Sequence, residues 1–123
     1  MRPIPLPLRQ QLEKEPRMKR CMLAGYEKLY GRCSEGRPEF HHVWIYAGRQ
    51  INEKWAILPA CHLHHREVGS DKAIKQAFET ASLMIANEED LAKYPKKDWD
   101  QLKIMLGIKK RNGRQKMRIP ELP

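Results

Sequence analysis

Histidines and cysteines crowd the middle of this chain. All five histidines and one of the three cysteines lie within residues 39–66. The histidines are His41, His42, His62, His64 and His65. Imidazole nitrogen and thiolate sulfur are the side-chain ligands that zinc and related transition metals prefer. Their density therefore predicts metal chemistry in this part of the chain.

The three cysteines and one histidine form the first candidate site. Cys61 and His64 are three residues apart at an expected helix start, so their side chains leave the same side of the first turn. Cys21 and Cys33 lie upstream and bring the ligands to the four that a tetrahedral structural zinc requires. We predict a structural Zn²⁺ at these four residues. An apolar cysteine cluster without metal is the alternative.

A second candidate site uses the remaining histidines. His65 follows His64 by about 100° around the helix, so it faces elsewhere and can hold a different ion together with His41. His42 is then left without a ligand role, and a free imidazole is well suited to act as a general base. In a strand His42 points away from His41, so a strand end or a bulge is needed to bring both to one phosphate. Histidines that only make structural hydrogen bonds are the alternative.

The elements that must position these residues are short. Pro3, Pro5 and Pro7 predict an extended arm rather than a helix over residues 1–9, with a helical turn at 9–15. Residues 21–33 indicate a compact loop or short helical turn. Aromatic and β-branched runs predict strands at 40–47 and 55–58, joined through a turn at 48–50, and Pro59 is expected to end the second. A helix is expected at 60–67.

The C-terminal half is predicted to be helical. Ile74, Phe78, Ala81 and Ile85 recur at helical spacing and predict a helix over 71–87, capped by Ser70 or Asp71. A link at 91–94 and a helix at 97–106 follow. The expected fold class is α+β, with two to three C-terminal helices. Along the chain we expect a basic, proline-rich arm at 1–20, a metal-binding core at 21–70, a helical part of the same domain at 71–107 and a basic tail at 108–123.

Positive charge is concentrated at the two ends. The chain carries a formal net charge of +9, of which residues 1–20 hold six basic and two acidic side chains, and residues 103–123 hold seven and one. Clustered Lys and Arg neutralise phosphates, which predicts a nucleic-acid partner. Three cysteines argue against a closed disulfide framework, and we find no secretory signal and no apolar run of membrane-spanning length. We expect a cytoplasmic protein with no membrane partner.

Two motifs together resemble a known family. Glu39-x-His41-His42, a strand pair, and then Pro59-x-Cys61-x-x-His64-His65 at a helix start are similar to the HNH endonucleases, in the zinc-knuckle variant that small phage and prophage proteins use. The resemblance covers residues 39–66, extended to Cys21. It implies a ββα-metal core and metal-dependent hydrolysis of DNA phosphodiester bonds. By position it makes His41 and His65 ligands of a catalytic divalent ion (Mg²⁺, Mn²⁺, Ni²⁺ or Zn²⁺) and His42 the general base.

The chain departs from the family pattern at two positions. The family's central asparagine usually lies nine residues before the helical histidine, where this chain has Ala56; Asn52 is the nearby substitute. A further ligand four residues after His65 would fall on Gly69. Asp71, water or the substrate phosphate is left to complete the metal's shell, and His62 is an alternative helical ligand.

Three cations flank the motif and are candidate phosphate ligands: Arg49, Lys54 and Arg66. Ordinary solvated charge is the alternative reading of each. The resemblance further implies a phage- or prophage-encoded protein in a bacterial cytoplasm, with phage recombination or packaging proteins as candidate partners. A non-catalytic, zinc-stabilised nucleic-acid-binding module is the second functional hypothesis, and a zinc-scaffolded protein-binding module the third.

Overall fold

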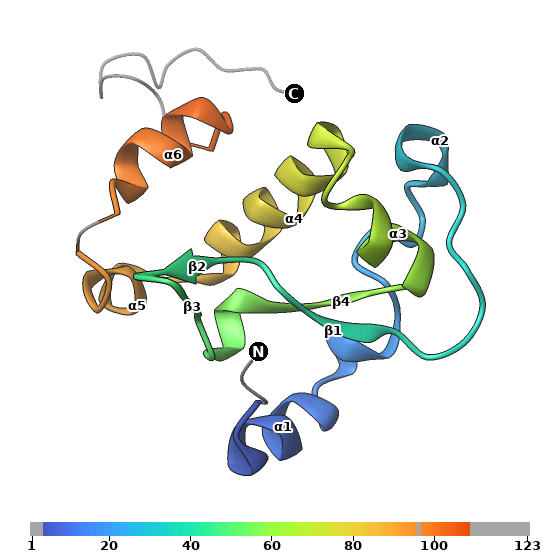
Figure 1. Cartoon of the computed structure of the whole chain (residues 1–123), viewed down its shortest axis with the longest axis horizontal. Helices are drawn as coiled ribbons and strands as arrows, with labels where there is room; N and C mark the ends of the chain where they lie inside the picture. Colours follow the sequence, from blue (N-terminus) through green and yellow to red (C-terminus); the bar gives the residue numbers. More distant parts are fainter. Residues whose placement is uncertain (1–3, 96, 109–123) are drawn as a thin grey trace.

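The computed structural model describes residues 4–95 and 97–108 as an α+β fold with two small antiparallel sheets, which confirms the expected class (Figure 1). The elements in chain order are α1 (Leu6–Glu13), the 3-10 turn η1 (Pro16–Lys19), α2 (Glu27–Tyr30), β1 (Glu39–His42), β2 (Ile45–Tyr46), β3 (Arg49–Gln50), the 3-10 turn η2 (Lys54–Ala56), β4 (Ile57–Ala60), α3 (His62–Glu67), α4 (Lys72–Ile85), α5 (Glu88–Ala92) and α6 (Trp99–Met105).

Strands β1 and β4 form the antiparallel pair at the centre of the molecule. Their register pairs Phe40 with Pro59 and His41 with Leu58. The second strand was predicted to end before Pro59, and this is wrong, because Pro59 lies inside β4. The Met22 N–H donates to the Pro59 carbonyl at 2.8 Å, so the polar edge of Pro59 faces away from β1. The missing proline N–H therefore removes no hydrogen bond between the strands.

The single strand predicted at 40–47 is two strands in two sheets. β1 ends at His42, and β2 pairs with β3 in a separate hairpin through Ile45–Gln50 and Tyr46–Arg49. Ala47 and Gly48 connect β2 to β3 with φ angles of 54° and 80°. Two adjacent positive φ values are typical of the tight hairpin turn that matches strand twist. The turn therefore lies one residue earlier than predicted, and Arg49 belongs to a strand.

The N-terminal segment is helical where an extended arm was expected. Helix α1 begins at Leu6 with Pro7 in its first turn, where the absent N–H has no intrahelical partner to lose. Both α1 and η1 pack on one side of the β1–β4 pair, through a cluster of Ile4, Leu12, Met18 and Ile57 (Figure 1). The Arg17 guanidinium fixes this layer by donating to the carbonyls of Ile57 at 3.1 Å and Lys54 at 2.6 Å.

Helices α3 and α4 cover the opposite side of the pair. Phe78 and Ile74 of α4 are fully buried against Leu58 and the cysteine-bearing segments. The helix predicted at 71–87 is confirmed as α4, and the Asp71 side chain caps it by accepting from the N–H groups of Ala73 and Ile74. Helix α4 also accepts the indole N–H of Trp44 on Ser82 Oγ, at 2.9 Å.

The C-terminal helices complete a second apolar cluster around three tryptophans: Trp44, Trp55 and Trp99. The helix predicted at 97–106 is confirmed as α6. The link predicted at 91–94 is wrong, because α5 occupies Glu88–Ala92 behind a capping box formed by Asn87 and Asp90. The described residues end at Ile108, so the rest of the predicted basic tail lies outside them. Among the helices of the described ranges, none combines the length and apolarity that a membrane span requires.

Candidate metal centre and histidine cluster

Cys21, Cys33, Cys61 and His64 converge as the sequence predicted. Their four ligand atoms all lie within 4.8 Å of one another. His64 Nδ1 is 3.2 Å from Cys61 Sγ and 3.7 Å from the Sγ atoms of Cys21 and Cys33. Neighbouring ligands of a tetrahedral zinc, with bonds of about 2.3 Å to sulfur and 2.0 Å to nitrogen, lie roughly 3.5–3.8 Å apart. The arrangement is therefore compatible with a closed structural metal site.

The hydrogen bond on the far side of the His64 ring fixes which nitrogen can bind a metal. His64 Nε2 lies 3.0 Å from the Tyr30 carbonyl oxygen, which can only accept. Nε2 therefore carries the proton, and the neutral ring presents an unprotonated Nδ1 to the three sulfurs. Metal-binding histidines usually donate their second ring N–H to a carbonyl or carboxylate in this way.

Local backbone geometry places the cysteines. Cys61 is the N-cap of α3, and its sulfur accepts from the His64 N–H at 3.4 Å. Burial raises the pKa of Cys33 to about 12, with further repulsion from Cys21. Burial also opposes ionisation of Cys61, but hydrogen bonds from the backbone of His64 and from Ser34 outweigh it and lower its pKa to about 6. Without a cation the cluster thus favours one thiolate, and a bound metal is what would keep all three ionised.

His41 and His65 lie together on the α3–α4 side of β1. Their ring centroids are 5.0 Å apart, and the His41 ring also contacts Phe78 at 4.9 Å. Burial lowers the pKa of His41 to about 4, helped by the neighbouring His65, His42 and Lys75. His41 is therefore neutral at pH 7 and keeps a lone pair for a ligand or a hydrogen bond.

Glu39 joins this histidine cluster, a role that the sequence reasoning missed. Glu39 Oε1 is 2.6 Å from His65 Nδ1, and Oε2 is 3.0 Å from His62 Nδ1. These two hydrogen bonds hold the carboxyl pKa of Glu39 below its usual range, and the bond to His65 has the larger effect. Two signals pointed to it: Glu39 is two residues before His41 and so shares its strand face, and His62 and His65 are one helical turn apart.

His42 lies on the other side of the strand. The β1–β4 register continues without a bulge to His42, the last residue of β1, so its side chain faces α1 and away from His41. His42 Nε2 is 2.7 Å from the amide oxygen of Asn52, which accepts from it. Nδ1 is then the unprotonated nitrogen of the neutral ring. Asn52, the expected substitute for the family's asparagine, thus contacts the candidate base.

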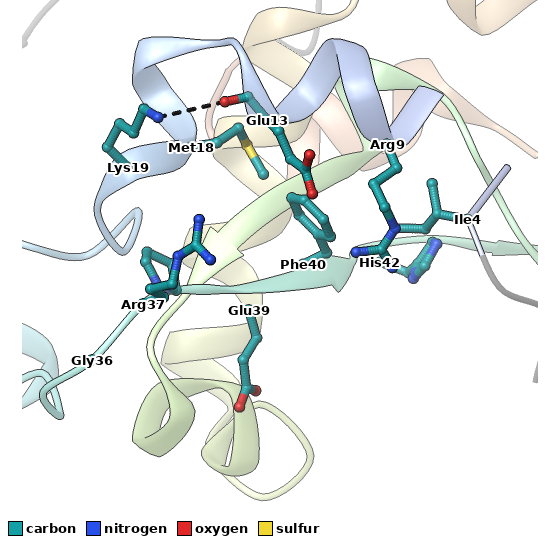
Figure 2. A pocket seen from close by; sticks show the side chains of 11 residues that line it. Ile4, Arg9, Glu13, Met18, Lys19, Gly36, Arg37, Glu39, Phe40 and His42 are labelled. Atoms are coloured by element: carbon teal, nitrogen blue, oxygen red, sulfur yellow. Dashed lines mark hydrogen bonds between the residues drawn. The ribbon is translucent and has the colours of Figure 1, made fainter. Parts of the chain in front are cut away.

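None of the predicted phosphate ligands lines the groove beside His42. Arg49, Lys54 and Arg66 are exposed, and Lys54 forms an ion pair with Glu15 at 3.0 Å. A groove of ≈ 850 Å³ between α1 and β1 instead brings His42 together with Arg9, Lys19 and Arg37 (Figure 2). These cations come from separate parts of the chain: the net charge of residues 1–20 was the sequence signal for Arg9 and Lys19, and nothing in the sequence pointed to Arg37.

The histidine cluster is looser than the cysteine site. In the described part of the chain, Cys21, Cys33, Cys61 and His64 are the one set of three or more ligating side chains whose ligand atoms converge. Comparison with protein-family models, curated proteins and solved structures gave no match for this chain.

Proposed function

We propose that this protein is a metal-dependent endonuclease of the HNH type that hydrolyses phosphodiester bonds in DNA. The observation that supports it best is the His42–Asn52 hydrogen bond, which orients a candidate base one residue away from the Glu39, His41, His62 and His65 cluster. These residues belong to a strand pair followed by a helix, the order of the ββα-metal core.

Zinc is the metal that best fits the cysteine site in this proposal. Three sulfurs and one imidazole nitrogen at near-tetrahedral spacing are typical of structural Zn²⁺. All four ligand positions come from protein, so the ion would have no open position for substrate. Its role is to fix the start of α3, which carries His65 and His62, against the Cys21–Cys33 loop.

His41 and His65, with Glu39, would hold the catalytic divalent ion. His65 Nδ1 and Glu39 Oε1 are 2.6 Å apart, so a divalent ion would take the place of the hydrogen bond between them and be held by both. The family pattern places a third ligand at the position of Gly69, which has no side chain to bind a metal. Glu39 would supply that third ligand instead. When bound, the ion would stabilise negative charge on the scissile phosphate and on the departing 3′ oxygen.

His42 would activate the attacking water. Its Nδ1 would accept a proton from the water while the water oxygen attacks phosphorus and the P–O3′ bond breaks. The departing 3′ oxygen would take a proton from solvent, which leaves 5′-phosphate and 3′-hydroxyl ends. Asn52 holds the ring in the required tautomer and then stabilises the imidazolium through the same amide oxygen. Because β1 pairs only with β4 among the described residues, its other edge is where a phosphate can reach groups on both faces of the strand.

The charge distribution favours DNA as the substrate. A net charge of +9, concentrated toward both ends of the chain, supplies sequence-independent affinity for phosphates. In the biological setting that the resemblance implies, the substrate would be phage or host DNA in a bacterial cytoplasm. Phage recombination or packaging proteins would be the partners.

Plasmid nicking tests the proposed activity. Purified protein is incubated with supercoiled plasmid and Mg²⁺, Mn²⁺, Ni²⁺ or Zn²⁺, beside His42→Ala and the surface variant Lys72→Ala. We expect nicking by the parent and by Lys72→Ala, and a loss of at least about 100-fold in His42→Ala, the usual range for a general base. Circular dichroism and plasmid binding should be unchanged. Equal nicking by both variants would refute the role of His42.

The second candidate function is a non-catalytic, zinc-stabilised nucleic-acid-binding module. The observation that favours it is the placement of His41 and His42 on opposite faces of β1. It predicts DNA binding without cleavage under all four metals. The same assay therefore separates the two functions.

A further inference from the structure

The groove beside His42 has a rigid wall. Helix α1 and η1 form it, and they are held to β4 by a buried apolar cluster and by the Arg17 guanidinium. The opposite wall is β1 with the loop at 36–38 that precedes it. The groove therefore exists before any ligand arrives.

The two arginines of this groove form no ion pair with the residues that the structure describes. Arg17 lies outside the groove, and its guanidinium forms an ion pair with Glu15 and donates to two backbone carbonyls. Arg9 and Arg37 differ: within the described ranges neither has a carboxylate partner, and Arg9 instead lies 5.1 Å from the centroid of the Phe40 ring. Two fork-shaped guanidinium groups are thus free to bind phosphate.

The negative charges in the groove are fewer and partly engaged. Glu39 lines it, but its carboxylate turns toward α3, where His62 and His65 bind it (Figure 2). Glu13 remains as the carboxylate on the α1 wall. Lys19 contributes a third cation and uses its ammonium group only on the Glu13 carbonyl, at 3.5 Å. The groove therefore carries a positive surplus.

Shape and chemistry select the ligand. The volume of ≈ 850 Å³ is within the roughly 300–1,000 Å³ of clefts that hold small ligands. A groove of this volume can hold a few nucleotides of one strand but cannot enclose the paired bases of a duplex. Ile4, Met18 and Phe40 give the groove apolar surface for sugars and bases, beneath cations that suit phosphates.

We propose that this groove binds a single strand of DNA, with Arg9 and Arg37 on successive phosphates and His42 at one end. The direction of the strand toward His42 rests on the proposed nuclease function, whereas the binding itself does not. If both hold, the preferred substrates are DNAs with unpaired segments, such as flaps, gaps, overhangs and the opened segments of supercoiled plasmid, and linear, fully paired duplex is cut poorly.

Binding without cleavage tests the groove. Fluorescence anisotropy of a labelled oligo-dT is measured over a salt series without added divalent metal, for the full-length parent, for Arg9→Ala/Arg37→Ala and for Lys28→Ala/Lys72→Ala. The control pair removes the same charge from exposed positions outside the groove. Each phosphate contact contributes about −0.7 to the salt slope on a single strand, so the groove variant should have a slope less negative by about 1.4, or about 25-fold weaker binding at 0.1 M salt.

A variant that binds more tightly distinguishes an effect on the groove from a loss of binding caused by misfolding. Glu13→Gln removes the remaining carboxylate from the wall and should tighten oligo-dT binding by several fold, which an unfolded variant cannot do. The inference is overturned if the groove and control pairs weaken binding equally, if blunt duplex binds the parent as tightly as oligo-dT, or if a poly-glutamate peptide competes as well as unlabelled oligo-dT. Plasmid nicking that survives in Arg9→Ala/Arg37→Ala would refute the direction of the strand toward His42 and leave the nuclease proposal standing. Groove binding by a parent protein that does not nick plasmid would refute the nuclease proposal and leave the groove standing.

Discussion

Cys33→Ser is the most direct test of the metal site. Cys33 is the least buried of the four ligands, so serine removes the thiolate without opening a core cavity. With metal bound, Cys33 divides the chain between Cys21 and Cys61 into loops of 12 (33 − 21) and 28 (61 − 33) residues. In the chain-entropy treatment of cross-links these loops contribute about 2.8 and 3.6 kcal/mol, against about 3.9 kcal/mol for one undivided loop. The substitution should therefore lower the free energy of unfolding by about 2.5 kcal/mol, before any loss of metal affinity.

Thermal unfolding with metal analysis measures this effect. A loss of about 2.5 kcal/mol corresponds to a Tm lower by about 10 °C for a chain of this size, while Arg32→Ser, at the exposed neighbouring position, should unfold with the parent. After metal is removed with a chelator, the Cys33→Ser and parent curves should coincide. A parent protein that purifies without metal, or a Cys33→Ser protein with unchanged Tm and full metal content, would refute the site.

Three further predictions follow from particular contacts. Asn52→Ala removes the hydrogen bond that orients His42, worth about 1.4 kcal/mol, and should slow plasmid nicking about tenfold with binding unchanged; an unaltered rate would exclude this role. Arg17→Ala should lower the urea-derived stability by about 2 kcal/mol, because two carbonyls lose a charged donor, while Arg20→Ala should change it by under about 0.5 kcal/mol. The pKa of His41 is depressed to about 4, so the unfolded chain gains a proton first as the pH falls below about 6.5; stability is complete above that pH and declines toward pH 4 by up to about 3 kcal/mol. His41→Leu lacks this component, and parallel acid-unfolding curves for the two proteins would refute it.

The four candidate metal ligands were predictable because ligand chemistry depends on residue type and short-range spacing. Cys61 and His64 had only to fall on one helical turn, and the odd cysteine count left Cys21 and Cys33 as partners. Helix α4 was predictable for a similar reason, since its apolar residues recur at the helical period over fourteen residues and Asp71 caps it. Local rules were sufficient in both places.

Tertiary contacts decided the features that the sequence did not predict. Prolines suggested an arm, but burial of Leu12 and Met18 on Ile57 stabilises a helix whose first turn tolerates Pro7. The run 40–47 has uniform strand propensity, yet the chain leaves the first sheet after His42 to bury Trp44 against Ser82 and Trp99. Propensity does not say which sheet a residue joins, so the groove beside His42 could not be located either.

The cysteine site is discontinuous in sequence, which matters while the chain is being made. Cys61 leaves the ribosome 28 (61 − 33) residues after Cys33, and His64 three residues later. At about 5–20 residues per second, Cys21 and Cys33 wait roughly 1.4–6 s without half of their coordination shell. During this interval the two thiols are exposed to oxidants and to other metal ions, and β4, which supports α1, has not been synthesised. Newly made protein should therefore depend on reducing conditions, and under the proposed zinc site on zinc supply, more strongly than the finished molecule, which buries Cys61 and His64.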